Sequence, residues 1–217
     1  MPKSVKTKRL LSMGGIALLA VFIAASYIIA APSQYTAQVS ILKNDEFLPP
    51  ITQDISQAAS EIVCAIYMFK TDSRDKGFTK LLLDSMLDAL KRGVKLYIIM
   101  DVSDDDSSST KFNRETGAKL KRAGAEVRYD EPERMLHAKT CVIDGHISYI
   151  GSHNYTFSAL QRNNELTTRI VSPDVAREVA TYIKSIDGSD LVRHKKPDTK
   201  KPDNKKSAKK KNTKKNK

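Results

Sequence analysis

The sequence predicts an α/β domain in which helices cover both faces of a mixed sheet, a layered α/β/α arrangement. Between residues 39 and 187, short apolar stretches of strand length alternate with longer stretches in which apolar residues recur every three or four positions. Such alternation is typical of layered α/β folds. An Asp-Gly pair between alternating apolar residues, at Asp144-Gly145, also indicates an antiparallel hairpin, so a mixed sheet is expected.

The individual elements follow from the apolar spacing and from the residues that end each stretch. The segment 78–92 is the clearest helix, because its apolar residues have helical spacing and Gly93 stands at its expected end. The other expected helices are 49–60, 111–123 and 173–186. Strands are expected at 39–42, 61–69, 94–100, 125–129 and 165–171, besides the two hairpin strands between 135 and 154.

The N-terminal part of the chain is expected to anchor the domain in a membrane. Residues 1–9 are basic, and residues 10–31 form an uncharged run that is long enough to span a bilayer. The positive-inside rule then places the N-terminus in the cytoplasm and the domain, after a linker at 32–38, in the periplasm or outside the cell. The alternative is a signal peptide that is cleaved near residues 31–33 and releases a secreted domain.

The basic charge of the chain is concentrated in its C-terminal tail. Residues 193–217 contain thirteen Lys or Arg and two Asp, while the whole chain has a net charge of +12. When the four basic residues of 1–9 are also set aside, the body carries −3 by difference. The tail, residues 188–217, is expected to be disordered. It is suited to binding nucleic acid or an anionic membrane, or serves only for solubility, whereas the domain shows no broad basic groove.

The hairpin is expected to gather polar side chains at the end opposite its turn. A two-residue loop at Asp144-Gly145 pairs Ile143 with His146 and, further along the strands, His137 with Ser152. Directly opposed residues lie close together, and alternate residues share a face. An imidazole, an ammonium, a hydroxyl and an amide then meet in a site for an anionic, oxygen-rich substrate: His137, Lys139, Ser152 and Asn154.

These residues resemble the HKD motif of the phospholipase D superfamily. The pattern H-x-K-x4-D-x6-G-S-x-N is filled at every fixed position, by His137, Lys139, Asp144, Gly151, Ser152 and Asn154. The resemblance covers roughly residues 35–186. It is closest to the small members with a single motif, which include a bacterial endonuclease and nuclease/lipase relatives of the mitochondrial surface. Glu165 stands where family members carry an acidic residue that orients the histidine.

The resemblance implies phosphodiester hydrolysis through a phosphohistidine, without a metal or other cofactor. His137 would attack phosphorus, and a second histidine would protonate the leaving oxygen. Glu165 would fix the tautomer of the nucleophile. The non-bridging oxygens would be held by Lys139, Ser152 and Asn154. Asp144, which shapes the turn or makes an ion pair, and the glycines Gly145 and Gly151 are expected to be structural.

The second histidine is missing from the chain itself. His146 lies beside the turn, His153 is expected on the opposite face, and His194 is in the tail, so His146 and His153 are interpreted as surface or supporting residues. The second imidazole is therefore expected from a second copy of the chain. In a two-fold symmetric homodimer, each His137 would meet its symmetry mate in one composite active site.

Three further features carry weaker expectations. Cys64 and Cys141 lie in apolar stretches without C-x-x-C spacing, so free buried thiols are expected rather than a zinc site. The run 104–106 of three aspartates is interpreted as a solvated loop. The segment 67–71 borders the substrate cleft in the family that the motif resembles, but its aromatic residues are equally typical of a strand end that packs into the core.

Two enzymatic functions and one non-catalytic function remain open. The first is a membrane-anchored endonuclease that cleaves DNA or RNA. The alternative is a phospholipase D that hydrolyses membrane phospholipids to phosphatidic acid. Both use the same phosphoryl chemistry, so the motif does not distinguish them. The third is a tether that binds polyanions through its tail and performs no chemistry.

Overall fold

The computed structural model describes residues 33–71, 77–103, 108–131 and 134–189. By its internal contacts the chain divides into a unit that ends at Tyr35 and a unit that begins at Thr36, and the fold is that of the second unit. Within the described ranges, no helix is long and apolar enough to cross a membrane. The expected anchor at 10–31 and nearly all of the expected disordered tail lie outside these ranges.

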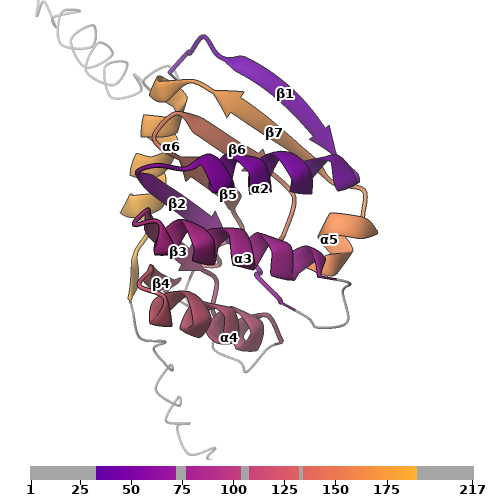
Figure 1. The fold of residues 1–217 in the computed structure, drawn as a ribbon, viewed down its shortest axis with the longest axis vertical. Coiled ribbons are helices and arrows are strands. Elements are labelled where there is room, and N and C mark those ends of the chain that lie inside the picture. The colour runs from indigo at the N-terminus through magenta and orange to yellow at the C-terminus, as the bar shows by residue number, and fades with distance from the viewer. Residues whose placement is uncertain (1–32, 72–76, 104–107, 132–133, 190–217) are drawn as a thin grey trace, which may run out of the picture. The chain divides into compact units, whose positions relative to one another are not determined.

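One mixed sheet of eight strands forms the centre of the domain, in the order β1-β7-β6-β5-β2-β3-β4-β8 (Figure 1). The pairs β2–β3 and β3–β4 are parallel, and the other pairs are antiparallel. The mixed sheet predicted from the sequence is thus confirmed. The strands are β1 (Gln38–Lys43), β2 (Glu61–Ile66), β3 (Lys95–Met100), β4 (Glu126–Asp130), β5 (Lys139–Ile143), β6 (Ile147–Gly151), β7 (Leu166–Val171) and β8 (Gly188–Ser189).

The helices cover both faces of this sheet, because the central strands present apolar side chains to both faces. Ile62, Cys64 and Ile66 of β2 share one core with the helices α2, α3 and α4, while Val63 and Ala65 share another with α6. Figure 1 shows α2, α3 and α4 side by side over one face. The helices are α2 (Leu48–Gln57), α3 (Phe78–Lys91), α4 (Ser108–Arg122), the short α5 (Phe157–Gln161) and α6 (Pro173–Ser185), with a 3₁₀ turn, η1 (Asn44–Phe47).

The expected strands and long helices are all present, with shifted ends. The strand expected at 61–69 ends at Ile66, because the following residues leave the sheet and Phe69 instead bridges to Tyr155. The helix α5 and the strand β8 are not among the expected elements. Both are too short to produce a periodic pattern, and β8 carries the fold beyond residue 187, where the tail was expected to begin.

The hairpin has a different register from the expected one. Ile143 pairs with Ile147, and Thr140 pairs with Ile150, so the loop has three residues rather than two. The backbone of Asp144 and of Gly145 is left-handed, with φ of 52° and 60°, as an Asp-Gly turn requires. His146 is the extra residue, since its carbonyl accepts from the N–H of Ser172 instead of pairing within the hairpin. This register differs from the expected one by one residue, so each residue lies opposite a different partner, and the expected pairing of His137 with Ser152 is wrong.

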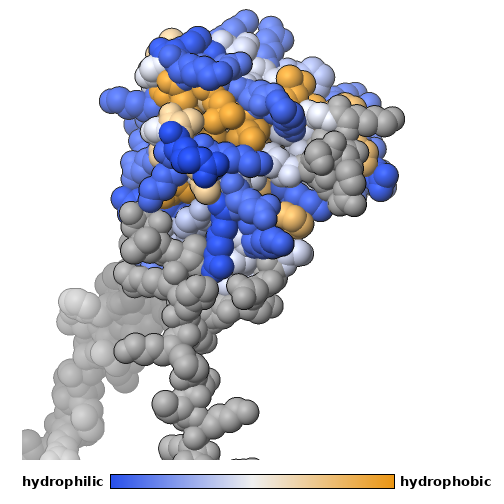
Figure 2. Space-filling view, turned by 60° about the horizontal axis from the view of Figure 1, so that its bottom comes forward, coloured by the Kyte–Doolittle hydropathy of each residue, from blue (hydrophilic) through white to orange (hydrophobic). Residues whose placement is uncertain are grey.

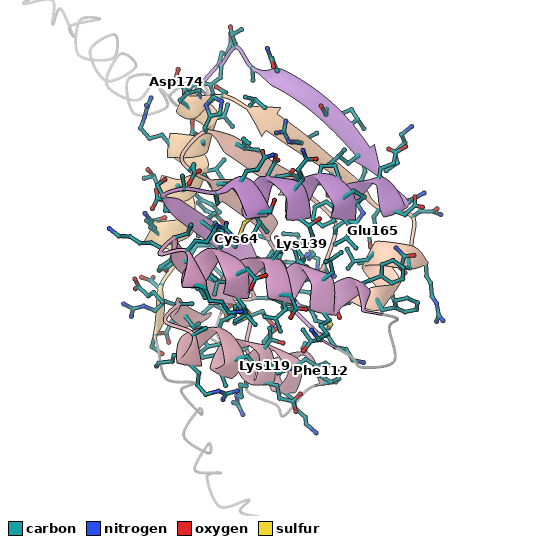
Figure 3. All side chains as sticks on the ribbon, in the orientation of Figure 1. Cys64, Phe112, Lys119, Lys139, Glu165 and Asp174 are labelled. Atoms are coloured by element: carbon teal, nitrogen blue, oxygen red, sulfur yellow. A yellow bond between two sulfur atoms is a disulfide. The ribbon has the colours of Figure 1, made fainter. Side chains whose placement is uncertain are left out.

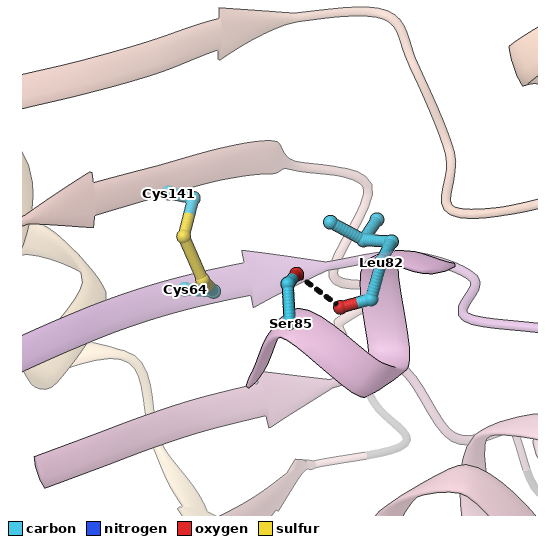
Figure 4. Close-up of a disulfide and its surroundings, with 4 residues drawn as sticks. All are labelled: Cys64, Leu82, Ser85 and Cys141. Atoms are coloured by element: carbon cyan, nitrogen blue, oxygen red, sulfur yellow. Dashed lines mark hydrogen bonds between the residues drawn. A yellow bond between two sulfur atoms is a disulfide. The ribbon is translucent and has the colours of Figure 1, made fainter. Parts of the chain in front are cut away.

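The expectation of free thiols is also wrong, because Cys64 and Cys141 form a disulfide (Figure 4). The two cysteines lie directly opposite each other in the antiparallel pair β2–β5. Sequence spacing did not reveal this pairing, since 77 positions separate the two cysteines and, along the chain, the strands β3 and β4 lie between β2 and β5, which become neighbours only in the folded sheet.

The surface of the domain is mostly polar. Figure 2 shows a largely hydrophilic face on which hydrophobic side chains gather in a patch. Within the described ranges, large apolar side chains are exposed on several elements, which is ordinary for a protein surface. They include Val39, Ile41, Leu81, Met135, Leu166 and Tyr182.

Candidate active site

Apart from Asp144, the motif residues lie along one edge of the sheet, where β2, β3 and β6 end and β5 and β7 begin. Lys139 is the first residue of β5, and His137 precedes it by two positions. Ser152 follows β6 directly, and Glu165 precedes β7 directly. Antiparallel pairing of β5, β6 and β7 brings these strand ends to the same edge. Figure 3 shows Lys139 and Glu165 in this part of the domain.

His137 and Lys139 both lie against the ring of Tyr67. The side chain of His137 is exposed, and its ring centroid is 4.8 Å from that of Tyr67. The Nζ of Lys139 lies 4.7 Å from the same ring centroid and donates to the carbonyl of His137 at 2.7 Å. Burial lowers the pKa of Lys139, whereas the carboxylates of Glu165 and Asp101 oppose this by favouring its charged form. A cation and an imidazole are thus held side by side at the surface.

Glu165 and Ser152 form a second cluster beside Lys139. The carboxylate of Glu165 accepts from the hydroxyl of Ser152 and, at 3.0 Å, from the amide of Asn163. The backbone N–H of Leu166 donates to the Ser152 hydroxyl at 3.1 Å. Glu165 therefore acts on the site through Ser152 and through its charge near Lys139 in this structure, and its expected hydrogen bond to His137 stays a prediction.

The remaining residues of the G-S-x-N segment have distinct surroundings. Gly151 lies so close to β7 that a Cβ would collide with Thr167 and with the carbonyl of Leu166, which explains why a residue without a side chain stands there. The Oδ1 atom of Asn154 is buried and has no hydrogen-bond partner within the described ranges. This buried oxygen of Asn154 is thus available to a ligand within the described part of the domain.

Asp144 lies at the other end of the hairpin, in the turn, and holds the chain between α2 and β2. Its carboxylate accepts from the backbone N–H groups of Ala59, Ser60 and Glu61 at 2.8 to 3.0 Å, and from the hydroxyl of Ser60. Burial alone would raise the pKa of Asp144, but these hydrogen bonds outweigh burial and lower it. The structure therefore gives Asp144 a structural position, with hydrogen bonds to the backbone in place of an ion pair.

The other two described histidines are not placed beside His137. His146 is exposed in the turn. His153 is only 1% exposed and stacks on Phe47, so it is not a surface residue, which leaves the supporting position of the two that were expected. Its Nε2 donates to the carbonyl of Asn44 at 2.9 Å, and its Nδ1 then accepts from the hydroxyl of Thr167. Burial lowers the pKa of His153, so this imidazole is neutral and fully engaged.

A pair of buried carboxyl groups lies next to the segment that precedes His137, and the sequence did not predict it. Asp101 and Asp130 are 3% and 4% exposed, and both accept from the N–H of Leu136, the residue before His137. Burial raises the pKa of Asp101 to about 6 and that of Asp130 to about 7. The signal in the sequence is an aspartate at the end of each of two apolar stretches, at Asp101 and Asp130.

A cavity of about 650 Å³ opens beside His137. Its lining is partly apolar and includes side chains from α6 and from the segment before β5. This offers room next to the imidazole for part of a substrate. The lining includes Met135, Leu136, His137, Ala138, Tyr182 and Ile186.

An α/β/α domain that brings an imidazole, an ammonium, a hydroxyl and a carboxylate to one sheet edge has the equipment of an enzyme that acts on phosphodiesters. The family described as "Cardiolipin synthase, PLD-like domain" matches residues 51–186. The chain belongs to the phospholipase D superfamily, a family of phosphodiester-acting enzymes.

Two curated relatives show how far the likeness extends. Cardiolipin synthase B of Salmonella typhimurium is 27% identical over 173 residues, which cover 72% of this chain and 40% of that protein. The mitochondrial cardiolipin hydrolase of Chlamydomonas reinhardtii is 32% identical over 104 residues, or 48% of this chain and 43% of that protein. The chain thus spans about two fifths of the length of these relatives.

Solved structures show the same fold. The phospholipase D family member Nuc from Salmonella typhimurium superposes with a TM-score of 0.60 at 20% identity, over 72% of this chain and 99% of that one. NucT from Helicobacter pylori gives a TM-score of 0.54 at 17% identity, over 70% of this chain and 96% of that one. At these identities the likeness establishes the fold and leaves the substrate open.

Proposed function

We propose that the protein is a phosphodiesterase that acts through a phosphohistidine on His137 without a metal. The observation that carries the proposal is the exposed imidazole of His137 at the sheet edge, with the Lys139 ammonium beside it and both against Tyr67. The carboxylate of Glu165 and the hydroxyl of Ser152 lie near the same ammonium. Such a site supplies a nucleophile and a cation for developing negative charge.

In the first half of the reaction, a nitrogen of the neutral His137 imidazole forms a bond to phosphorus as the bond to the leaving oxygen breaks. Lys139 neutralises charge on the non-bridging oxygens, and Ser152 and Asn154 contribute hydrogen bonds. The partner subunit's His137 gives its proton to the leaving oxygen. In the second half it takes a proton from water, whose oxygen attacks phosphorus and releases His137.

The dimer in this proposal follows from the count of available imidazoles. Within the described ranges, His153 is buried and engaged and His146 lies in the distant turn, so neither supplies the acid. A two-fold axis beside His137 supplies it from a second copy.

For the substrate we propose DNA or RNA, cleaved outside the cytoplasm by a domain that residues 10–31 anchor in the membrane. The lysine-rich tail at 193–217 supports this, because a polycation captures nucleic acid and delivers it to the site. The disulfide between Cys64 and Cys141 supports an oxidising compartment, where such bonds persist.

The second candidate is hydrolysis of membrane phospholipids to phosphatidic acid. Relatives named cardiolipin synthase and cardiolipin hydrolase favour it, as does a domain body that carries no excess of positive charge. The chemistry of His137 is the same in both cases.

One assay separates these functions. The purified full chain in detergent and EDTA is incubated with single-stranded DNA, with RNA, or with vesicles that contain cardiolipin, and a His137→Ala variant is the control. We expect cleavage of nucleic acid that the variant does not perform. Cleavage of lipid alone would reverse the order of the two candidates. Binding of nucleic acid without cleavage of any substrate would show a non-catalytic tether.

A further inference from the structure

Two buried carboxyl groups converge on the backbone directly before His137. Asp101 follows β3, and Asp130 ends β4. The N–H of Leu136 donates to Oδ1 of Asp101 at 3.1 Å and to Oδ2 of Asp130 at 2.8 Å, and the N–H of Val102 donates to Oδ1 of Asp130 at 2.8 Å. Asp101, Asp130 and Leu136 are 3%, 4% and 5% exposed, so the carboxyl oxygens that bind this N–H are largely removed from water. The carboxyl groups thus fix the peptide from which His137 projects.

Ionisation of both Asp101 and Asp130 is unfavourable in this buried site. The donors that the structure gives to the carboxyl oxygens are backbone N–H groups, which stabilise one buried carboxylate but do not neutralise two. Burial raises the pKa of Asp101 to about 6, with Lys139 opposing the rise, and raises that of Asp130 to about 7, with the charge of Asp101 adding to it. The two carboxyl groups are therefore most stable when one of them is ionised and the other is protonated.

The remaining polar and charged groups around the pair come from four segments. Lys139 faces Asp101 from β5. From α4, the neutral amide of Asn113 donates to the carbonyl of Asp101 at 2.7 Å. The cavity that Asp130 lines also contains titratable side chains from the segment after β4 and from the segment before β8: Glu131, Arg134, His137 and Asp187.

We propose that Asp101 and Asp130 are positioning residues for His137, and that they do this by sharing one proton while both bind the N–H of Leu136. This rests on the proposed role of His137 as nucleophile. When the pair loses its proton as the pH rises, two carboxylates repel each other at a single donor, and the peptide before His137 is released. A nucleophile displaced by about 1 Å loses on the order of 100-fold in rate.

The test compares two variants whose effects on the pair differ. Asp101→Asn keeps an oxygen for the N–H of Leu136 and places an N–H donor toward Asp130, so it imitates the singly protonated pair at every pH. Asp130→Ala removes the acceptor of both Leu136 and Val102. Turnover of bis(4-nitrophenyl) phosphate by the full chain in detergent is measured between about pH 5 and pH 9.

For Asp101→Asn we expect a kcat within about threefold of the wild type near pH 6, and loss of the alkaline decline that the wild type shows above about pH 7. For Asp130→Ala we expect kcat to fall about 10- to 100-fold with KM within about twofold, since substrate contacts remain. An Asp101→Asn profile that declines like the wild type, or an unchanged kcat in Asp130→Ala, would overturn the proposal.

A buried carboxylate elsewhere in the fold provides the control. Asp54 on α2 is 8% exposed and pairs with Arg169 at 2.6 Å, on the face of the sheet that packs against α2. We expect Asp54→Asn to lower the melting temperature and to keep the wild-type dependence of kcat on pH. A shifted pH profile in Asp54→Asn as well would assign the effect to general destabilisation and count against the proposal.

A measurement without catalysis separates this proposal from the proposed function. Carboxyl ¹³C and amide NMR of the full chain in micelles follows Asp101, Asp130 and the N–H of Leu136 against pH. We expect both carboxyl groups to titrate between about pH 5 and pH 8 and the Leu136 resonance to move with them. Ordinary titration below about pH 5 overturns the proposal even in an active enzyme. Absence of diester turnover in the wild type overturns the function of His137, while the NMR result still decides whether the pair shares a proton.

Discussion

At the scale of single residues, Tyr67 links the two reactive groups of the site. It leaves the end of β2 and touches both His137 and the ammonium of Lys139. Its backbone is also held from two sides, because its N–H donates to the carbonyl of Ala138 and its carbonyl accepts from Asn113. The ring thus offers a fixed wall against which the imidazole and the lysine stem are packed.

We therefore expect Tyr67→Ala to lower kcat about 10-fold, because both side chains gain freedom, while Tyr67→Phe keeps kcat within about twofold since the ring is retained. Kinetics with a chromogenic phosphodiester checks this. Equal losses in both variants would show that the hydroxyl, rather than the ring, is what the site needs.

We expect substitution of Asp144 to change the stability of the domain and to leave the turnover of each folded molecule unchanged. Asp144→Ala leaves three backbone N–H groups without their acceptor and should lower the free energy of unfolding by about 2–3 kcal/mol. A lowered pKa means that this stabilisation is present above the ordinary value of 3.8 and is lost as the pH falls through the lowered pKa.

Urea unfolding of Asp144→Ala at neutral and at acidic pH measures both effects, and the two proteins should converge in acid. The control is Asp174→Ala, which removes an exposed carboxylate paired with Arg177 on α6 (Figure 3) and should change stability by less than about 0.5 kcal/mol. A large loss of turnover per folded Asp144→Ala molecule would contradict the structural role.

At the scale of elements, the pair β2–β5 joins the parallel half of the sheet to the hairpin that carries the site. Cys64 and Cys141 fasten this pair, and Lys139 lies two positions from Cys141 at its end. The closed loop between the cysteines contains β3, β4 and the helices α3 and α4.

We expect removal of the disulfide in a Cys64→Ala, Cys141→Ala double variant to lower the free energy of unfolding by about 2–4 kcal/mol, because the unfolded chain gains freedom in a long loop. Denaturant unfolding of the oxidised wild type against the double variant measures the change. A reducing agent should destabilise the wild type and leave the variant unaffected. A wild type that does not respond to reduction would contradict the bond.

The sequence predicted the elements and the motif because both depend on local patterns. Apolar spacing located α3 and β2, and Asp144-Gly145 located the hairpin turn. What it did not predict depends on neighbours distant in the chain. The extra residue at His146 is tied to Ser172, and the opposition of Cys64 to Cys141 exists only in the assembled sheet. The carboxyl pair of Asp101 and Asp130 likewise forms only where two parallel strands end side by side.

At the scale of the whole molecule, the proposed site is complete only in a dimer. Each domain presents a single exposed imidazole at its catalytic edge within the described ranges, and the reaction needs both a nucleophile and an acid. If only dimers of two wild-type chains are active and subunits combine at random, activity follows the square of the wild-type fraction.

We expect a mixture of equal parts wild-type and His137→Ala subunits, exchanged to equilibrium, to retain about a quarter of the wild-type activity rather than half. Diester turnover across a series of mixing ratios checks this, with sedimentation equilibrium to verify that dimers form. A linear dependence on the wild-type fraction would show that each chain works alone.

The hydrogen bond from Ala59 to Asp144 closes a span of 85 positions, nearly the same span that the disulfide closes. During synthesis, β2 and its partner β3 therefore emerge long before β5, and one edge of β2 stays without a partner until β5 has been synthesised. An apolar strand edge that stays open during synthesis can pair with other chains, so the hydrogen bonds of Asp144 and the disulfide complete the part of the fold that is formed last along this edge.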